Sequence, residues 1–139
     1  MSYRREDTMD VAGRIDDRLW QRFGRAHVFK DVDSLPLGMD FRQYLRAEVG
    51  KCGVMLVVIG KQWVPILQQR SRSQADDYVR IEVAEGLRRG IPVIPLLVQG
   101  ATMPKREELP DDLKDLAARH GTDLRSDPHF HPDMTQLLD

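Results

Sequence analysis

The feature that most constrains the fold is an uninterrupted apolar run, closed by a glycine at each end. The run is GVMLVVIG at residues 53–60, and a second run of the same character spans residues 91–98. A strand with one face in water alternates apolar and polar residues, whereas a parallel strand covered by helices on both faces is apolar throughout. The two runs therefore predict two buried strands of a parallel sheet.

Helix and strand signals alternate along the rest of the chain. A helix with one apolar face is predicted near the start of the chain, capped by Asp7 or Thr8 and ended by Gly24. Further helices are predicted at about residues 40–49, 110–119 and from 134 onward, and short strands at 27–31 and 122–124. Asp76 or Asp77 is predicted to cap another helix, which runs to about Arg89. Residues 61–76 are predicted to form a long polar connection. This alternation predicts an α/β fold, in which helices cover both faces of a parallel sheet.

Composition narrows the class of protein. The chain has 139 residues, the size of one domain, and its 21 basic and 22 acidic residues nearly cancel. Charge therefore indicates neither a nucleic acid nor an anionic membrane as a partner. We expect no signal peptide and no membrane-spanning segment, since no apolar run has the required length. Cys52 is the only cysteine and precedes a buried strand, which favours a reducing compartment and a cytoplasmic protein.

Known phosphate-binding motifs do not fit the sequence. The pattern G-x-G-x-x-G does not follow any predicted strand, which excludes the usual dinucleotide fingerprint. Gly53 and Gly60 resemble a P-loop only superficially, because six residues separate them and Gln62 stands where a serine or threonine would bind magnesium. A phosphoryl-receiver domain would need an aspartate at the end of the central strand, and Ile59, Gly60 and Lys61 supply none.

Histidines and aspartates near the end of the chain could be drawn as a metal site. They are His120, Asp127, His129, His131 and Asp133. Their spacing places no three ligands on one rigid element, so we predict no metal.

Four separated stretches resemble the motifs of one known family and occur in the same order as in that family. They are SYRRED at residues 2–7, AGRI at 12–15, VFKDVDSLPLGMDF at 28–41 and DYVRIE at 77–82. Together they resemble the bacterial Toll/interleukin receptor (TIR) domain over nearly the whole chain. The resemblance implies a three-layer flavodoxin-like parallel sheet of five strands. It also implies one of two functions: NAD+ cleavage by a glutamate of the third helix, or non-catalytic assembly with other TIR domains, in bacterial signalling or anti-phage defence.

The catalytic motif of the family is an aromatic residue, usually tryptophan, four positions before the glutamate. Here the motif falls on Tyr78 and Glu82. A separation of four places both side chains on adjacent turns of one helix face. The pair lies on the flank of the predicted buried stripe, which consists of Val79, Val83 and Leu87. The alternative interpretation is an ordinary helix start with solvated acids, for which Glu85 would serve equally well.

The chemistry explains why one carboxylate would suffice. Nicotinamide leaves NAD+ as a neutral molecule, so the remaining task is to stabilise an oxocarbenium-like ribose, and NAD+ is a substrate rather than a cofactor. Tyr78 would stack on the nicotinamide ring. Arg4 and Arg5, in the same stretch as Ser2, would meet the pyrophosphate, with ordinary surface arginines as the alternative. Trp63 would line the cleft or pack in the core, and we favour packing.

The loop after the predicted second strand corresponds to a TIR loop that contributes to assembly and to closing the ligand cleft. Its residues are Asp33, Ser34, Leu35, Pro36, Leu37 and Gly38. Pro36 stiffens the loop, and Gly38 can adopt a positive φ. The expected partners are therefore NAD+ and other TIR domains.

The amino end departs from the family pattern. TIR domains begin with an apolar strand before the Ser-Tyr-Arg stretch, and here only Met1 precedes it. In a flavodoxin-like order this strand lies between the second and the third. We therefore expect residues 1–139 to form a single TIR domain whose first strand is largely missing, truncated at the N-terminus and possibly one module of a longer protein.

Overall fold

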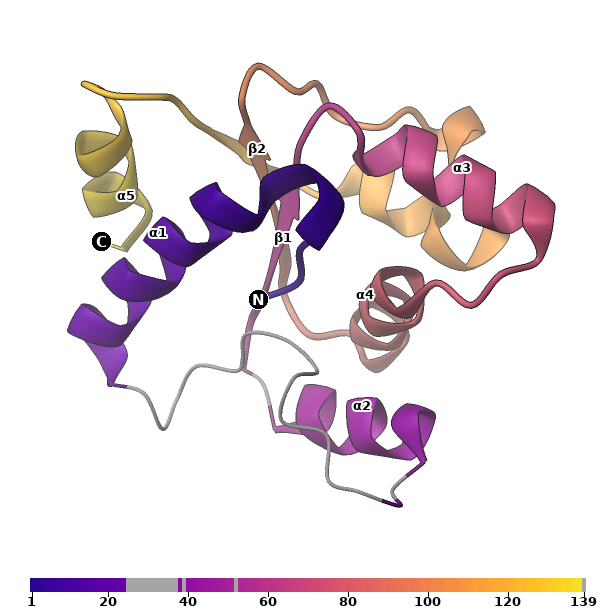
Figure 1. Ribbon diagram of the computed structural model, residues 1–139. Coiled ribbons are helices and arrows are strands. Elements are labelled where there is room, and N and C mark those ends of the chain that lie inside the picture. Colours follow the sequence, from indigo (N-terminus) through magenta and orange to yellow (C-terminus); the bar gives the residue numbers. More distant parts are fainter. Residues whose placement is uncertain (25–37, 39, 52, 139) are drawn as a thin grey trace.

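The computed structural model describes residues 1–24, 38, 40–51 and 53–138. Within these ranges, three parallel strands form one sheet in the order β1 (Met55–Ile59), β2 (Val93–Val98) and β3 (Thr122–Leu124). Met55 of β1 pairs with Val93 of β2, and Leu96 of β2 pairs with Thr122 of β3. Helices lie on both sides of the sheet (Figure 1). The α/β class with a parallel sheet is therefore confirmed.

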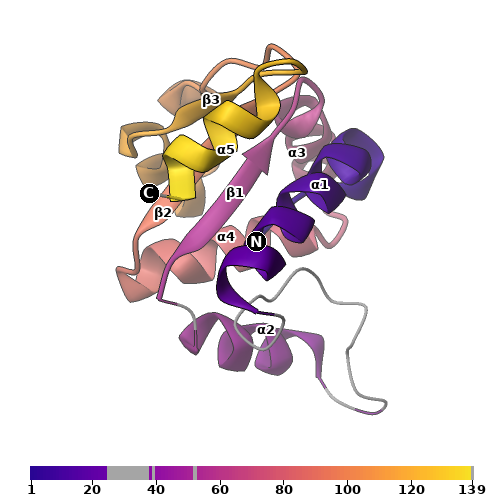
Figure 2. The same ribbon diagram turned by 90° about the vertical axis from the view of Figure 1, so that its left-hand side faces the viewer.

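The strands serve two cores, because alternate residues of a strand point to opposite faces. On one face, Val57 and Ile59 belong to a core completed by α2 (Phe41–Gly50), α3 (Trp63–Ser73), α4 (Tyr78–Arg89) and the 3-10 helix η4 (Asp111–Ala118). On the other face, Leu56 and Val58 pack with α1 (Arg5–Phe23) and α5 (Phe130–Leu138). Figure 2 shows this second face, with α1 and α5 toward the viewer. The two layers explain why the strands are apolar without alternation.

A single bridge at Ser2 represents the first strand. The Ser2 amide donates to the Leu56 carbonyl at 2.7 Å, and the Val58 amide donates to the Ser2 carbonyl at 2.8 Å. Ser2 thereby pairs in parallel with Val57 of β1. The bridge places the start of the chain beside β1, as a flavodoxin-like order requires. The predicted second strand at residues 27–31 lies outside the described residues.

The predicted polar connection at 61–76 is wrong, because residues 63–73 form the helix α3. Trp63 and Leu67 lie four positions apart on one face of α3, and both are completely buried. Two large anchors with this spacing, together with Val64 against the same core, dock a short helix whose residues 68–73 are all polar. Pro65 is compatible with the helix because it sits in the first turn, where an amide has no helical partner.

Several helix boundaries also differ from the prediction. Helix α1 begins at Arg5 with Arg4 as its cap, so the predicted cap at Asp7 or Thr8 is wrong. Thr8 instead lies at a kink inside the helix, with φ −135° and ψ 26°. The predicted helix at 110–119 is a 3-10 helix, η4, and a shorter one, η3, spans Arg106–Glu108. Helix α5 begins at Phe130, four residues before the predicted Met134. No helix in the described ranges is both long and apolar enough to cross a membrane.

Gly60 ends β1 at a point where the first turn of α1 passes very close. A Cβ atom at Gly60 would lie 2.5 Å from Asp7 Oδ2 and 2.6 Å from Thr8 Cγ2. The same aspartate accepts a hydrogen bond from the Gln62 amide at 3.2 Å through its other oxygen. The absence of a side chain at Gly60 therefore lets α1 begin directly over the end of β1.

We expect Gly60→Ala to lower the free energy of unfolding by about 1–3 kcal/mol, because overpacking at a tight contact displaces the backbone. Gly13→Ala is the matched control: no atom lies within 4 Å of a Cβ at Gly13, and alanine favours a helix by up to about 1 kcal/mol over glycine. Urea denaturation of both variants measures the difference. Equal stability of Gly60→Ala and the wild type would contradict the close approach.

Candidate functional site

Three segments far apart in the sequence meet around one buried side chain, that of Arg4. The Arg4 guanidinium donates from Nη1 to Asp77 Oδ1 at 2.9 Å, from Nη2 to Asp77 Oδ2 at 2.8 Å, and from Nε to the Trp63 carbonyl at 3.2 Å. Its central carbon lies 5.3 Å from the centre of the Trp63 ring. Arg4 immediately precedes α1, Trp63 begins α3 and Asp77 caps α4. The guanidinium thus ties the starts of three helices together.

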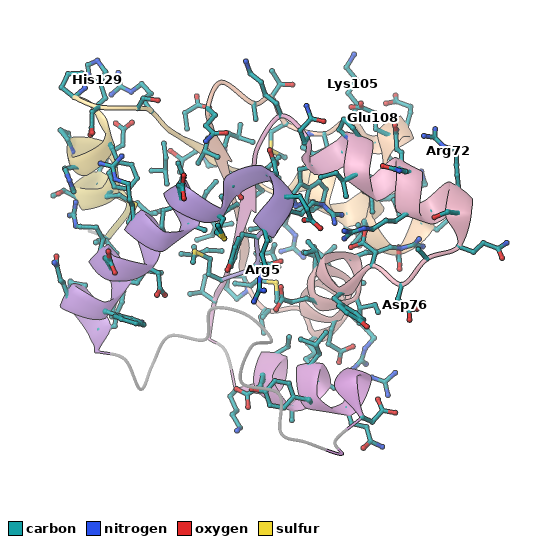
Figure 3. The ribbon with its side chains drawn as sticks, in the orientation of Figure 1. Arg5, Arg72, Asp76, Lys105, Glu108 and His129 are labelled. Atoms are coloured by element: carbon teal, nitrogen blue, oxygen red, sulfur yellow. The ribbon has the colours of Figure 1, made fainter. Side chains whose placement is uncertain are left out.

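This arrangement contradicts the expected role of Arg4. Its side chain is 0% exposed, so the guanidinium does not lie open to a pyrophosphate. The physical reason is that the Asp77 carboxylate offers the two parallel acceptors that a guanidinium binds best. Arg5 is exposed at the first residue of α1 and is labelled in Figure 3. Of the two arginines, Arg5 is the one that a dissolved ligand reaches.

Trp63 and Ser2 also lie inside the molecule. Trp63 is completely buried in the core on the α3 and α4 side of the sheet, which is the packing alternative that the sequence favoured over a place in the cleft. Ser2 is 1% exposed, and its backbone pairs with β1. Within the described part of the chain, the Ser2 hydroxyl and the Trp63 indole N–H have no hydrogen-bond partner. Neither side chain is positioned to contact a ligand from solvent.

Asp77 has two structural roles. Its Oδ1 atom accepts a hydrogen bond from the Arg80 amide at 3.4 Å, which confirms the predicted cap of α4. Arg70 contributes a second cation, with Nη1 at 3.6 Å from Asp77 Oδ1, and also pairs with Glu6. Burial acts to raise the pKa of the Asp77 carboxyl, but the hydrogen bonds and charge of Arg4 outweigh it and hold that pKa below its ordinary value. Asp77 is therefore ionised across the physiological range.

The two residues of the aromatic–glutamate motif lie in different environments. Tyr78 is 47% exposed at the first residue of α4, whereas Glu82, one turn later, is only 7% exposed. The predicted stripe packs as expected, because Val83 is completely buried and Val79 and Leu87 pack against the same core. Glu82 is therefore not one of the solvated acids of the alternative interpretation.

Glu85, the other acid that the sequence left open, is engaged in ion pairs. Arg88 Nε donates to Glu85 Oε2 at 3.1 Å, and Arg89 Nε donates to Glu85 Oε1 at 2.8 Å. The hydrogen bonds from Arg88 are the main cause that lowers the pKa of the Glu85 carboxyl to about 2. Glu85 is therefore a structural carboxylate, paired with arginines three and four residues later on the same helix.

Among the residues that the structure describes, two cavities border this part of the molecule, and Glu82 lines neither of them. One, of 290 Å³, opens at the carboxyl ends of β1 and β2, between the first turns of α3 and the loop at residues 100–104, with Lys61 at its edge. The other, of 500 Å³, lies between α4 and η4 and is lined in part by Ile81, Glu85 and Asp112.

The predicted interaction loop is described only at Gly38. This glycine is exposed and has a φ of +79°, the conformation that the sequence predicted for it. The other predicted loop residues lie outside the described residues: Asp33, Ser34, Leu35, Pro36 and Leu37.

The histidines and aspartates near the end of the chain are mostly engaged with arginines. Asp127 accepts hydrogen bonds from Arg14, and Asp133 from Arg125. His131 contacts Arg18 through Nδ1 at 2.9 Å. In the ranges that the structure covers, no three histidine, cysteine, aspartate or glutamate side chains gather to hold a metal ion. Figure 3 shows His129 just before the start of α5, away from Arg5.

The fold and the site define a doubly wound α/β domain with a buried glutamate on the helix that precedes β2. The family model of the TIR domain matches residues 1–138. The chain therefore belongs to the TIR-domain family.

Comparison with solved structures supports the fold. The chain is similar to a structure described as the activated Roq1 resistosome directly recognizing the pathogen effector XopQ (TIR domains). The TM-score is 0.68 at 17% sequence identity, over 99% of this chain and 92% of that one. At this identity the likeness concerns the fold alone. A search of curated proteins gives no significant match.

The ion pairs of Glu85 generate a prediction about pH. A carboxyl whose pKa falls from 4.5 to about 2 on folding stabilises the protein above pH 4.5, and this contribution is lost as the pH falls toward 2. We expect wild type to be more stable than Glu85→Gln at pH 7 and the difference to shrink between pH 5 and 2. Urea denaturation across this range measures it. A constant difference would show that the two arginines do not hold the ionised form.

Proposed function

We propose that this TIR domain is an NAD+ glycohydrolase that releases nicotinamide, with Glu82 as the catalytic carboxylate. The observation that carries the proposal is the position of Glu82, a carboxylate only 7% exposed on the second turn of α4, one turn after the exposed Tyr78. A carboxylate shielded from water interacts with a developing positive charge more strongly than a solvated one. Membership of the TIR family supports the same assignment.

The reaction needs little more than this charge. The bond between the ribose C1′ and the nicotinamide nitrogen breaks, and its electron pair neutralises the pyridinium nitrogen. Glu82 stabilises the resulting oxocarbenium-like ribose, a water molecule adds to C1′, and one proton is released to solvent. The products are nicotinamide and ADP-ribose, or a cyclic form if an internal nucleophile replaces the water.

Two exposed residues are proposed to bind the substrate. Tyr78 offers its ring to the nicotinamide or the adenine, as an aromatic face does for another ring. Arg5 offers a cation to the pyrophosphate from the start of α1, in place of the buried Arg4. NAD+ is the substrate and no further cofactor is proposed. The cytoplasm is the proposed compartment, an inference that rests on the single cysteine.

Substituting Glu82→Gln tests the proposal directly, because the amide keeps the shape of the side chain and removes its charge. We expect nicotinamide release to fall by about 10²–10³-fold, the cost of losing one preorganised charge at a reacting centre. Nicotinamide release from NAD+ is measured by chromatography, with the folded fraction of each variant measured by circular dichroism.

Glu85→Gln is the matched control, since it removes a second carboxylate that is 8% exposed on the same helix. Its activity per folded molecule is expected to equal that of the wild type. Unchanged nicotinamide release in Glu82→Gln would remove Glu82 from the mechanism.

We also propose that the domain associates with other TIR domains. Family membership supports this proposal, and we propose the predicted loop around Pro36 and the helix after Asp40 as the contacts. If a neighbouring copy completes the ligand cleft, nicotinamide release per molecule rises with protein concentration, because association follows mass action. Activity and light scattering over a dilution series measure this. Specific activity that stays constant down to high dilution would contradict it.

A further inference from the structure

The Arg4–Asp77 pair joins two elements that lie far apart in the sequence. Arg70 adds a weaker link between them, since it pairs with Glu6 of α1 and lies 3.6 Å from Asp77. Arg4 and Asp77 are 73 residues apart, and their side chains are 0% and 4% exposed. Arg4 ends the segment that pairs with β1, and Asp77 is the cap from which α4 begins. A bidentate pair fixes both the distance and the relative orientation of its partners, because both nitrogens must meet both oxygens.

The pair is not explained by stability alone. Removing two charges from water is costly, and well-packed apolar residues often stabilise a core as well as a buried ion pair does. What the pair supplies in addition is geometry, since an apolar contact would permit α4 to slide or rotate without losing much free energy. The Nε bond to the Trp63 carbonyl extends the same constraint to the start of α3.

The sequence neighbours of the two partners are the residues that the proposed function uses. Arg5 follows Arg4 and is exposed, and Tyr78 follows Asp77 and is 47% exposed. Glu82 lies five residues after Asp77, on the helix that Asp77 caps. The pair therefore lies beneath the starts of the two helices that carry the proposed substrate-binding residues and the proposed catalytic carboxylate.

We propose that Arg4 and Asp77 are positioning residues, which hold the start of α4, with Tyr78 and Glu82, at a fixed orientation relative to Arg5. The inference rests on the proposed NAD+ cleavage. Neither side chain touches the substrate, because both are buried and occupied by each other. A displacement of about 1 Å at a reacting centre costs about 100-fold in rate, so a modest rotation of α4 is enough to impair catalysis.

The test removes the pair without leaving a buried charge alone. In the double variant Arg4→Met with Asp77→Asn, methionine fills the space of the arginine stem, and asparagine is still able to cap α4 toward the Arg80 amide. We expect this variant to fold and its kcat per folded molecule to fall at least about tenfold, since α4 is no longer fixed. Hydrogen exchange of the amides at residues 80–83 is expected to become faster, while exchange in α5 stays unchanged.

Met134→Ala is the stability control. Met134 is completely buried on α5, in the core on the opposite face of the sheet. Its loss lowers the free energy of unfolding without touching Arg4 or Asp77, so kcat and KM per folded molecule are expected to match the wild type. If it loses as much kcat as the double variant, the effect is one of general stability and the positioning role is refuted.

A conservative variant covers the case in which the double variant does not fold. Arg4→Lys keeps the charge but cannot form two parallel bonds and the Trp63 contact at once. We expect its kcat to lie between those of the double variant and the wild type. Wild-type kcat in a folded Arg4→Lys or double variant would overturn the inference.

The two proposals fail in distinguishable ways. If the wild-type protein releases no nicotinamide at any concentration, the proposed function is wrong, and the positioning role is then decided by hydrogen exchange alone. Faster exchange at residues 80–83 in the double variant, with α5 unchanged, would still support a fixed α4. Unchanged exchange at both places would refute it.

Discussion

The structure depends on one short strand that is buried on both faces. All five residues of β1 are buried, and they point alternately into the two cores on the two faces of the sheet. Burying apolar surface is the dominant favourable contribution to folding, and a residue such as Val57 or Val58 buries its whole side chain. Both helix layers are therefore needed to bury β1, since each layer covers the side chains on one face of the strand.

This constraint explains how much of the fold the sequence predicts. A strand buried on both faces must be apolar throughout, so β1 and β2 are visible as runs, and α4 is visible from the spacing of Val79, Val83 and Leu87. Helix α3 is not predicted by the same reasoning. Only Trp63 and Leu67 of this helix are completely buried, and its residues 68–73 are all polar, as in a loop. Short helices held by two anchors leave little periodicity to detect.

The candidate site also has one part that the sequence predicts and one part that it does not. The position of Glu82 follows from local spacing on one helix, and the family resemblance singles it out. The partner of Arg4 cannot be predicted from the local sequence. Arg4 and Asp77 are 73 residues apart, and nothing in the residues around either one indicates that they are in contact. Asp77 is predictable as a helix cap, a role that depends on neighbouring residues. Its second role, as the partner of Arg4, depends on the folded chain and is visible only in three dimensions.

One feature at the start of the chain links the two cores. Tyr3 belongs to the core beneath α1 and α5, whereas the next residue, Arg4, lies against Trp63 of the opposite core. The backbone at Ser2 is bonded to β1, between the two layers. Displacement of either helix layer therefore also disturbs the other, because Tyr3 packs in one layer and Arg4 in the other. Helices on opposite sides of a sheet can in principle melt separately, but here the crossing at residues 2–4 couples them, which favours loss of both layers in one cooperative transition.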